Sequence, residues 1–171
     1  FEILVGSVLT QNTTWTSVEK SLENLRKEGL LDPMRLAGVK LDELETLIRP
    51  SGFMRAKARY LKNLTEWYIK TDARAGEIDT PTLRNSLLQV PGVGEETADD
   101  ILLYAYDRPV FIFDAYARRL LAAAGLGEFR TYRQARQACD AAWCAEGFTV
   151  EELAVFHGLV VQAGKDARRE G

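Results

Sequence analysis

Hydrophobic residues recur at helical spacing along almost the whole chain. Segments with apolar positions three or four residues apart are typical of helices that bury one face. They are FEILVGSVLTQ (1–11), WTSVEKSLENLRKEG (15–29), LDELETLI (41–48), FMRAKARYLKNLTEWYIK (53–70), TPTLRNSLLQ (80–89), EETADDILLYAY (95–106), DAYARRLLAAAG (114–125), YRQARQACDAAWCAEG (132–147) and VEELAVFHGLVVQAG (150–164).

Several residues predict where these helices begin and end. Gly29 closes the second segment, and the third is expected to stop at Arg49–Pro50, because a residue before proline avoids the helical region. Thr80 is expected to cap the fifth helix, with Pro81 in its first turn. PVFIF (109–113) is short and has no second alternating run to pair with. The pattern predicts an all-α protein with short connections.

Composition indicates a globular protein and excludes several classes. The 171 residues are 46% hydrophobic and 27% charged, and no apolar run reaches the roughly 18 residues of a membrane span. Nothing at the start resembles a signal peptide, and because the chain begins at Phe1 without a methionine, we expect an N-terminal piece to precede it. Cys139 and Cys144 are predicted to be unpaired thiols rather than a bridge, in a reducing cytoplasm.

The charge is uneven along the chain. A formal net charge of −3 argues against non-specific coating of nucleic acid, but binding depends on one face and not on the sum. Five cations gather within fourteen residues: Arg49, Arg55, Lys57, Arg59 and Lys62. They form either a solvated helix face or a face that contacts DNA.

The segment LLQVPGVGEETADDILLYAY (87–106) raises the question of a phosphate site. Gly92 and Gly94 are expected to permit positive φ and close backbone approach, so that successive N–H groups open toward a phosphate at the start of a helix. Two acids, Glu95 and Glu96, stand at the same place. Acidic side chains are favourable at a helix N-terminus, but they repel phosphate. The sequence does not explain why Glu95 stands beside a predicted phosphate site.

The chain resembles the helix-hairpin-helix DNA glycosylases of the endonuclease III family. FEILVGSVLTQNT is similar to the family's first barrel helix and glutamine loop, PSGFMRAKA to its G-x-x-x-x-K-A segment, VPGVGEETA to its hairpin, and FHG (156–158) to its late helix. The resemblance implies two helical lobes with a DNA cleft between them. Residues 1–111 would form the barrel with the hairpin at about 80–105, and residues 112–171 a C-terminal lobe with Asp114 at the seam.

Two departures from that family shape the expected chemistry. Glu96 stands where the lyases carry a lysine that forms a Schiff base, and a carboxylate cannot form an imine. Gln162 and Lys165 lie where the family places cysteines of an iron–sulfur cluster. The resemblance therefore implies a monofunctional glycosylase with no cluster, no other metal and, at most, a monovalent cation at the hairpin.

Both departures, with LTQNT followed by an aromatic residue and RPSGF, are similar to the bacterial 3-methyladenine DNA glycosylases of this fold. That branch implies that Trp15 stacks on the extruded base, although tryptophan at such a position is usually core. Lys165 would lie near the base pocket, or else be a solvated lysine. Gln11 would fill the gap in the duplex, and capping of the first helix is compatible with that role. The expected DNA contacts are Gln11, Arg55, Lys57, Gly92, Val93, Gly94 and Thr97.

Asp114 is the expected catalytic carboxylate by the same resemblance, and from its sequence context alone it is a helix N-cap. His157 is expected to be a packing residue with its hydrogen bonds satisfied, rather than a catalytic one.

The leading hypothesis is excision of alkylated purines such as 3-methyladenine from double-stranded DNA by a cytoplasmic, nucleoid-associated bacterial monomer with no membrane contact. The alternatives are a thymine or uracil mismatch glycosylase and a DNA-binding module without catalysis.

Overall fold

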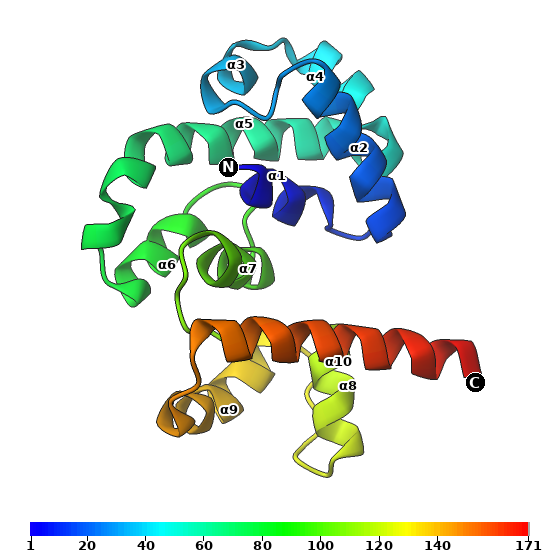
Figure 1. Cartoon of the computed structure of the whole chain (residues 1–171), viewed down its shortest axis with the longest axis vertical. Coiled ribbons are helices and arrows are strands. Elements are labelled where there is room, and N and C mark those ends of the chain that lie inside the picture. The colour runs from blue at the N-terminus through cyan, green and yellow to red at the C-terminus, as the bar shows by residue number, and fades with distance from the viewer. Residues whose placement is uncertain (171) are drawn as a thin grey trace. The chain divides into compact units, whose positions relative to one another are not determined.

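The computed structural model describes residues 1–170, with side chains up to Ala167 (Figure 1). The described residues are helical with no β-strand, as the sequence predicts. They divide into two compact units, Phe1–Ile101 and Leu102–Gly171. The domain boundary that the resemblance implies, after residue 111, stays a prediction.

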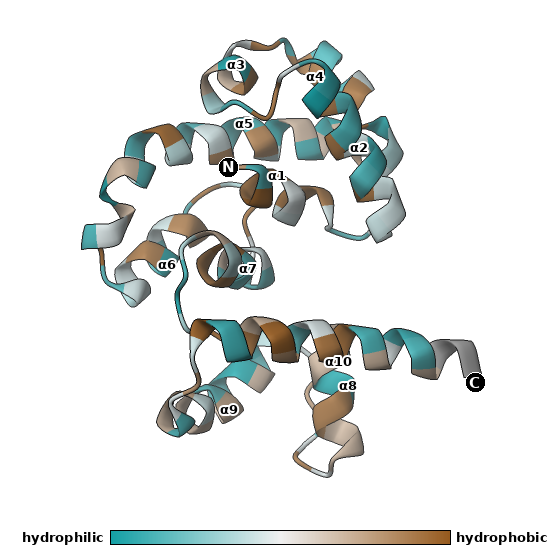
Figure 2. Cartoon of the chain, viewed as in Figure 1, coloured by the Kyte–Doolittle hydropathy of each residue, from teal (hydrophilic) through white to brown (hydrophobic). Residues whose placement is uncertain are grey.

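The first unit is built around one long helix, α5 (Met54–Thr71), which contacts α1 (Glu2–Leu9), α3 (Pro33–Gly38) and α4 (Leu41–Leu47). The other elements of this unit are α2 (Trp15–Lys27), the 3₁₀ helices η1 (Arg49–Ser51) and η2 (Asp72–Glu77), α6 (Thr80–Leu88) and the start of α7 (Glu95–Ala105). Hydrophilic and hydrophobic residues are interspersed along α2 and α4 (Figure 2), and hydrophobic residues such as Leu25 and Leu44 are buried.

Local signals explain most of the helix ends in this unit. Thr14 accepts a hydrogen bond from the Ser17 N–H and begins α2, and Gly29 lies just beyond its end with φ +66°, as predicted. α6 is capped by Asp79 and not by Thr80, because the Asp79 carboxylate accepts the Thr82 N–H at 2.9 Å. α4 ends at Leu47, and Arg49–Pro50 continue as a 3₁₀ turn rather than leaving the helical region.

The second unit contains the end of α7 and the helices α8 (Ala115–Ala123), α9 (Tyr132–Glu146) and α10 (Val150–Glu170), with α8 contacting both other helices. The buried segment 110–113 leads directly into Asp114. Phe111 stacks on Trp143 with ring centroids 4.3 Å apart, and Phe156 packs against both rings. This aromatic cluster anchors the segment that positions the candidate carboxylate.

Candidate functional site

The helix-hairpin-helix consists of α6, the turn at 89–94 and α7. Gly92 has φ +99°, and a Cβ there would lie 2.1 Å from the ring of Tyr60, so a larger residue would be strained and would also clash. Gly94 is exposed, is not among the residues with positive φ, and has open space where a Cβ would lie. The prediction of positive φ is therefore confirmed for Gly92 and wrong for Gly94. The open space leaves the backbone at the start of α7 accessible.

Gln11 ties the glutamine loop to this hairpin. Its side-chain amide donates to the Gly92 carbonyl and to the Thr97 hydroxyl, both at 3.0 Å. The side chain therefore does not cap α1, a role that the sequence left compatible with a DNA contact. Thr97 and Val93 are buried, so in this conformation their side chains hold the hairpin together. Their predicted contacts to DNA would therefore be made by backbone N–H groups, and they stay a prediction.

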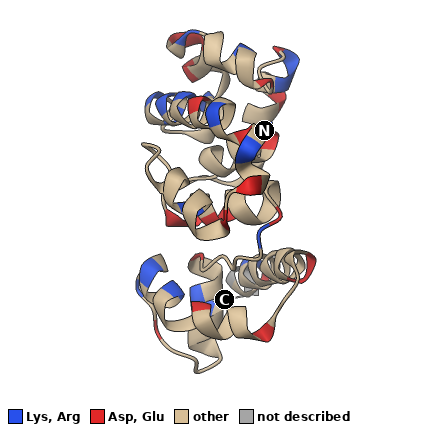
Figure 3. Ribbon diagram, turned by 90° about the vertical axis from the view of Figure 1, so that its left-hand side faces the viewer, with Lys and Arg blue, Asp and Glu red and all other residues tan. Residues whose placement is uncertain are grey.

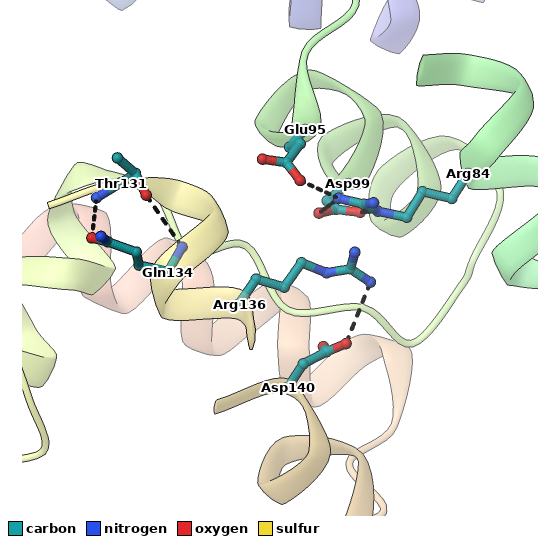
Figure 4. Close-up of polar contacts among 7 residues, drawn as sticks. All are labelled: Arg84, Glu95, Asp99, Thr131, Gln134, Arg136 and Asp140. Carbon is teal, nitrogen blue, oxygen red and sulfur yellow. Dashed lines mark hydrogen bonds and ion pairs between the residues drawn. The ribbon is translucent and has the colours of Figure 1, made fainter. Parts of the chain in front are cut away.

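The acidic start of α7 has a partner inside the protein (Figure 4). Buried Arg84 on α6 binds Asp99 through two hydrogen bonds of 2.7 and 3.0 Å, and its guanidinium also lies 4.0 Å from the carboxylate of Glu95. Paired acids on α7 thus clamp the two helices of the hairpin together. This accounts for Glu95, which the sequence left open, and adds Arg84 and Asp99, which it missed.

Lys57 does not lie on the exposed face of α5. Its side chain is buried, and its amine donates to the carbonyls of Leu9 and Ser51, both at 2.7 Å. Burial lowers the pKa of this amine from 10.5 to about 8. The structure therefore replaces the predicted DNA contact of Lys57 with a structural role, in which its amine joins the end of α1 to the end of η1.

The other four cations between residues 49 and 62 are of two kinds: one binds carbonyl groups within the protein, and three are exposed. Lys62 donates to the carbonyls of Leu36, Ala37 and Val39 at the end of α3, and burial lowers its pKa. Three arginines are exposed and remain available to a nucleic acid: Arg49, Arg55 and Arg59. Basic and acidic residues are interspersed in each unit (Figure 3). The positive charge of these three arginines is therefore confined to a small part of the surface.

Trp15 is the first residue of α2 and is 54% exposed. The alternative that it is a core residue is therefore wrong, although stacking on a base stays a prediction. Phe53, at the start of α5, is likewise exposed and adopts a left-handed backbone conformation with φ +46°. The first unit thus presents two exposed aromatic rings, at the starts of α2 and α5.

Asp114 begins α8 in the second unit. One carboxylate oxygen accepts the Ala117 N–H at 2.7 Å, so the N-cap interpretation is confirmed. The other oxygen faces Nε2 of His157 on α10, 3.7 Å away. The Asp114 side chain keeps 12% of its surface exposed.

His157 is half-buried and lies against the carboxylate rather than only packing in the core. Its Nδ1 lies 2.7 Å from the Tyr104 hydroxyl, while its buried Nε2 makes no hydrogen bond. The expectation of a fully satisfied packing residue is therefore wrong for Nε2. The sequence spacing gave one indication that His157 faces the interior, because His157 lies on the same face of α10 as buried Leu153 and Val160.

The remaining predictions concern Lys165, the two cysteines, a metal site and a membrane span. Lys165 is exposed, as a solvated lysine would be. Cys139 and Cys144 are unpaired, as predicted, and among the described residues no three His, Cys, Asp or Glu side chains gather as metal ligands. No described helix is long and apolar enough to cross a membrane. An open hollow of about 590 Å³ beside the start of α9 is lined by none of the predicted site residues.

Comparison with known proteins agrees with this geometry. The chain is 44% identical over 131 residues to a protein of Methanocaldococcus jannaschii named as a DNA repair glycosylase, covering 74% of this chain and 60% of that one. It is 30% identical over 122 residues to a thymine/uracil-DNA glycosylase of Pyrobaculum aerophilum, covering 70% and 50% of the two chains. The chain thus spans between half and two thirds of the length of these relatives.

A solved structure covers nearly all of the chain. It is the H. pylori 3-methyladenine DNA glycosylase (MagIII) bound to 1,N6-ethenoadenine, which matches with a TM-score of 0.80 and 31% identity over 98% of this chain and 85% of the other. The model of the HhH-GPD superfamily of base excision DNA repair proteins matches residues 5–144, which include the hairpin and Asp114. On this match the chain belongs to the HhH-GPD superfamily of base excision DNA repair proteins.

Proposed function

We propose that this protein is a DNA glycosylase that hydrolyses the N-glycosidic bond of alkylated purines, such as 3-methyladenine, in double-stranded DNA. The observation that carries the proposal is Asp114. It is a nearly buried carboxylate, fixed by the Ala117 N–H and directly preceded by an aromatic-anchored segment. A fixed negative charge of this kind stabilises an oxocarbenium-like sugar.

The reaction requires little machinery beyond that charge. An N3-alkylated purine is cationic, so the C1′–N bond breaks with its electron pair leaving on the base, and no general acid is needed. Water then forms the new C1′–O bond and gives its proton to the Asp114 carboxylate. The nucleotide must first be turned out of the duplex.

Glu96 supports the absence of lyase activity. It is exposed at the start of α7, where the lyases that the chain resembles carry their nucleophilic lysine. The product would then be an abasic site with an intact backbone.

Trp15 supports a cationic aromatic substrate. An exposed indole attracts a cationic base through its π face, in addition to apolar contact. The bound 1,N6-ethenoadenine of the H. pylori relative is also a modified purine. Gln11, Arg55 and the open backbone at Gly94 are the proposed contacts to the duplex, and a monovalent cation at the hairpin remains part of the proposal.

A thymine or uracil mismatch glycosylase is the second candidate, and the relative from Pyrobaculum aerophilum favours it. A non-catalytic DNA-binding module has less support, because the acidic hairpin that suggested it is partly explained by the contact of Glu95 with Arg84. Relatives from M. jannaschii as well as H. pylori leave the bacterial assignment a prediction.

A panel of duplexes, each with one defined lesion, tests the proposal. The panel contains 3-methyladenine, 7-methylguanine, 1,N6-ethenoadenine, a G·T mismatch and a G·U mismatch, and each reaction is divided in two. One half is treated with alkali to cleave abasic sites, and the other is analysed untreated. We expect strand cleavage only after alkali and only for alkylated purines. Release of thymine or uracil alone would favour the mismatch enzyme, and cleavage without alkali would contradict monofunctional chemistry.

A further inference from the structure

Three side chains in the second unit form a line that ends at the candidate carboxylate. Tyr104 comes from α7, His157 from α10 and Asp114 from the start of α8. The Tyr104 hydroxyl lies 2.7 Å from Nδ1 of the imidazole, and Nε2 lies 3.7 Å from the second carboxylate oxygen of Asp114. The mechanism described above uses neither Tyr104 nor His157.

The short contact with Tyr104 at Nδ1 and the carboxylate that faces Nε2 together favour one tautomer of the histidine. The Tyr104 hydroxyl lies 2.7 Å from Nδ1 and 3.5 Å from the Ala154 carbonyl oxygen. Donation to Nδ1 is the stronger of these two hydrogen bonds, since 3.5 Å is beyond the usual range for O–H···O. A neutral imidazole that accepts at Nδ1 carries its hydrogen on Nε2, and that hydrogen faces Asp114.

Nε2 is also the atom whose hydrogen-bonding capacity is unused. It is buried and makes no hydrogen bond in the structure, because 3.7 Å is too long for an N–H···O bond. A buried donor without an acceptor is unfavourable, and a carboxylate is the strongest acceptor available to it. Hydrogen bonds within active sites are often long without substrate and shorten in the reacting complex.

We propose that His157 is a positioning residue for Asp114, and that Tyr104 sets its tautomer. The Nε2–H group then fixes the second carboxylate oxygen, while the Ala117 N–H fixes the first. The carboxylate is thereby held in one orientation toward the sugar. This inference rests on the proposed function, because it assigns His157 a role through Asp114.

The chain contains one histidine, so its imidazole signals in an NMR spectrum need no assignment. The protein is labelled with ¹⁵N and prepared without a histidine tag, and long-range ¹H–¹⁵N correlations identify which ring nitrogen carries the proton above its titration range. We expect the Nε2–H tautomer in wild type and a mixture of tautomers in Tyr104→Phe. A predominant Nδ1–H tautomer in wild type would overturn the inference, whether or not the protein excises any base.

Single-turnover excision separates positioning from packing. His157→Leu removes the donor at similar volume, and we expect excision to slow by about ten- to hundredfold, as loss of one hydrogen bond to a charged group allows, with duplex affinity unchanged. His157→Gln keeps an N–H donor at the position of Nε2 and should recover most of that rate. Equal rates for the two variants would contradict positioning, since a packing role does not depend on the donor.

Tyr104→Phe adds a test that packing cannot mimic. In the wild-type background it should slow excision several-fold, because the imidazole loses the hydrogen bond that sets its tautomer. In the His157→Gln background it should have no further effect, because an amide has no tautomers. Additive losses would overturn the assignment of Tyr104. Excision abolished by Asp114→Asn but unchanged in all these variants would leave the proposed function standing and remove this inference.

Discussion

The buried amine of Lys57 makes the stability of this protein depend on pH in a direction that the structure defines. Its pKa in the folded chain is about 8, whereas the ordinary value is 10.5. Between these two values the unfolded chain binds a proton that the folded chain does not, so the free energy of unfolding rises with pH. The slope reaches about 1.4 kcal/mol per pH unit. From pH 7.5 to pH 10 the expected gain is about 2 kcal/mol.

Lys57→Met removes the titrating group and keeps an unbranched side chain. The variant should be less stable than wild type by about 2 kcal/mol or more at high pH, because the buried Leu9 and Ser51 carbonyls lose their donor. Urea unfolding at several pH values measures the free energy of unfolding of wild type and of Lys57→Met. The titration of all other residues cancels in the difference between the two values. That difference should grow by about 2 kcal/mol from pH 7.5 to pH 10. The exposed Lys70→Met is the matched control on the same helix, with a difference near zero throughout. A pH-independent difference for Lys57→Met would refute the reasoning.

Three further predictions concern the hairpin and the aromatic loop. Trp15→Ala should slow excision by roughly ten- to a hundredfold in single-turnover assays, with its melting temperature nearly unchanged because the side chain is exposed. Borohydride should trap no protein–DNA adduct during base release, because Glu96 cannot form an imine, and a trapped adduct would mean that a lysine reaches the sugar. Arg84→Met should lower the free energy of unfolding by about 3–5 kcal/mol, since it leaves Asp99 charged and buried. Adding Asp99→Leu should recover much of that loss in urea unfolding, and a double variant as unstable as Arg84→Met would contradict the clamp.

Periodicity and capping residues account for most of the fold that could be predicted from the sequence. The missed helix α3 had its own signals, since Asp32 caps it through the Arg35 N–H and Pro33 stands at its first turn. The wrong cap of α6 reflects competition between neighbours, because a carboxylate one residue earlier reaches the Thr82 N–H.

The burial of side chains was the property of the candidate site that was hardest to predict from the sequence. Lys57 lies four residues before Leu61 and seven before Leu64 on the buried stripe of α5, so its position indicated burial while its charge indicated the surface. The contact of Asp114 with His157 joins residues 43 positions apart, and no local pattern predicts it. The pairing of Glu95 with Arg84 is likewise a product of how the hairpin folds.

The central claim is that Asp114 supplies the charge and the base for hydrolysis. Asp114→Asn retains an oxygen that can accept the Ala117 N–H, so the cap of α8 should persist, while the charge and basicity are lost. Asp32→Asn is the matched control, because Asp32 caps α3 through a similar bond of 2.9 Å to the Arg35 N–H and has no proposed catalytic role.

The most direct measurement is single-turnover release of 3-methyladenine from one duplex, at one salt concentration, by wild type, Asp114→Asn and Asp32→Asn, with duplex affinity measured in parallel. We predict that Asp114→Asn excises at least about a hundredfold more slowly than wild type, binds the duplex equally well or slightly more tightly, and that Asp32→Asn behaves as wild type. Equal excision rates for wild type and Asp114→Asn would contradict the catalytic assignment. If wild type released no base from any duplex of the lesion panel, the protein would be better explained as a DNA-binding module.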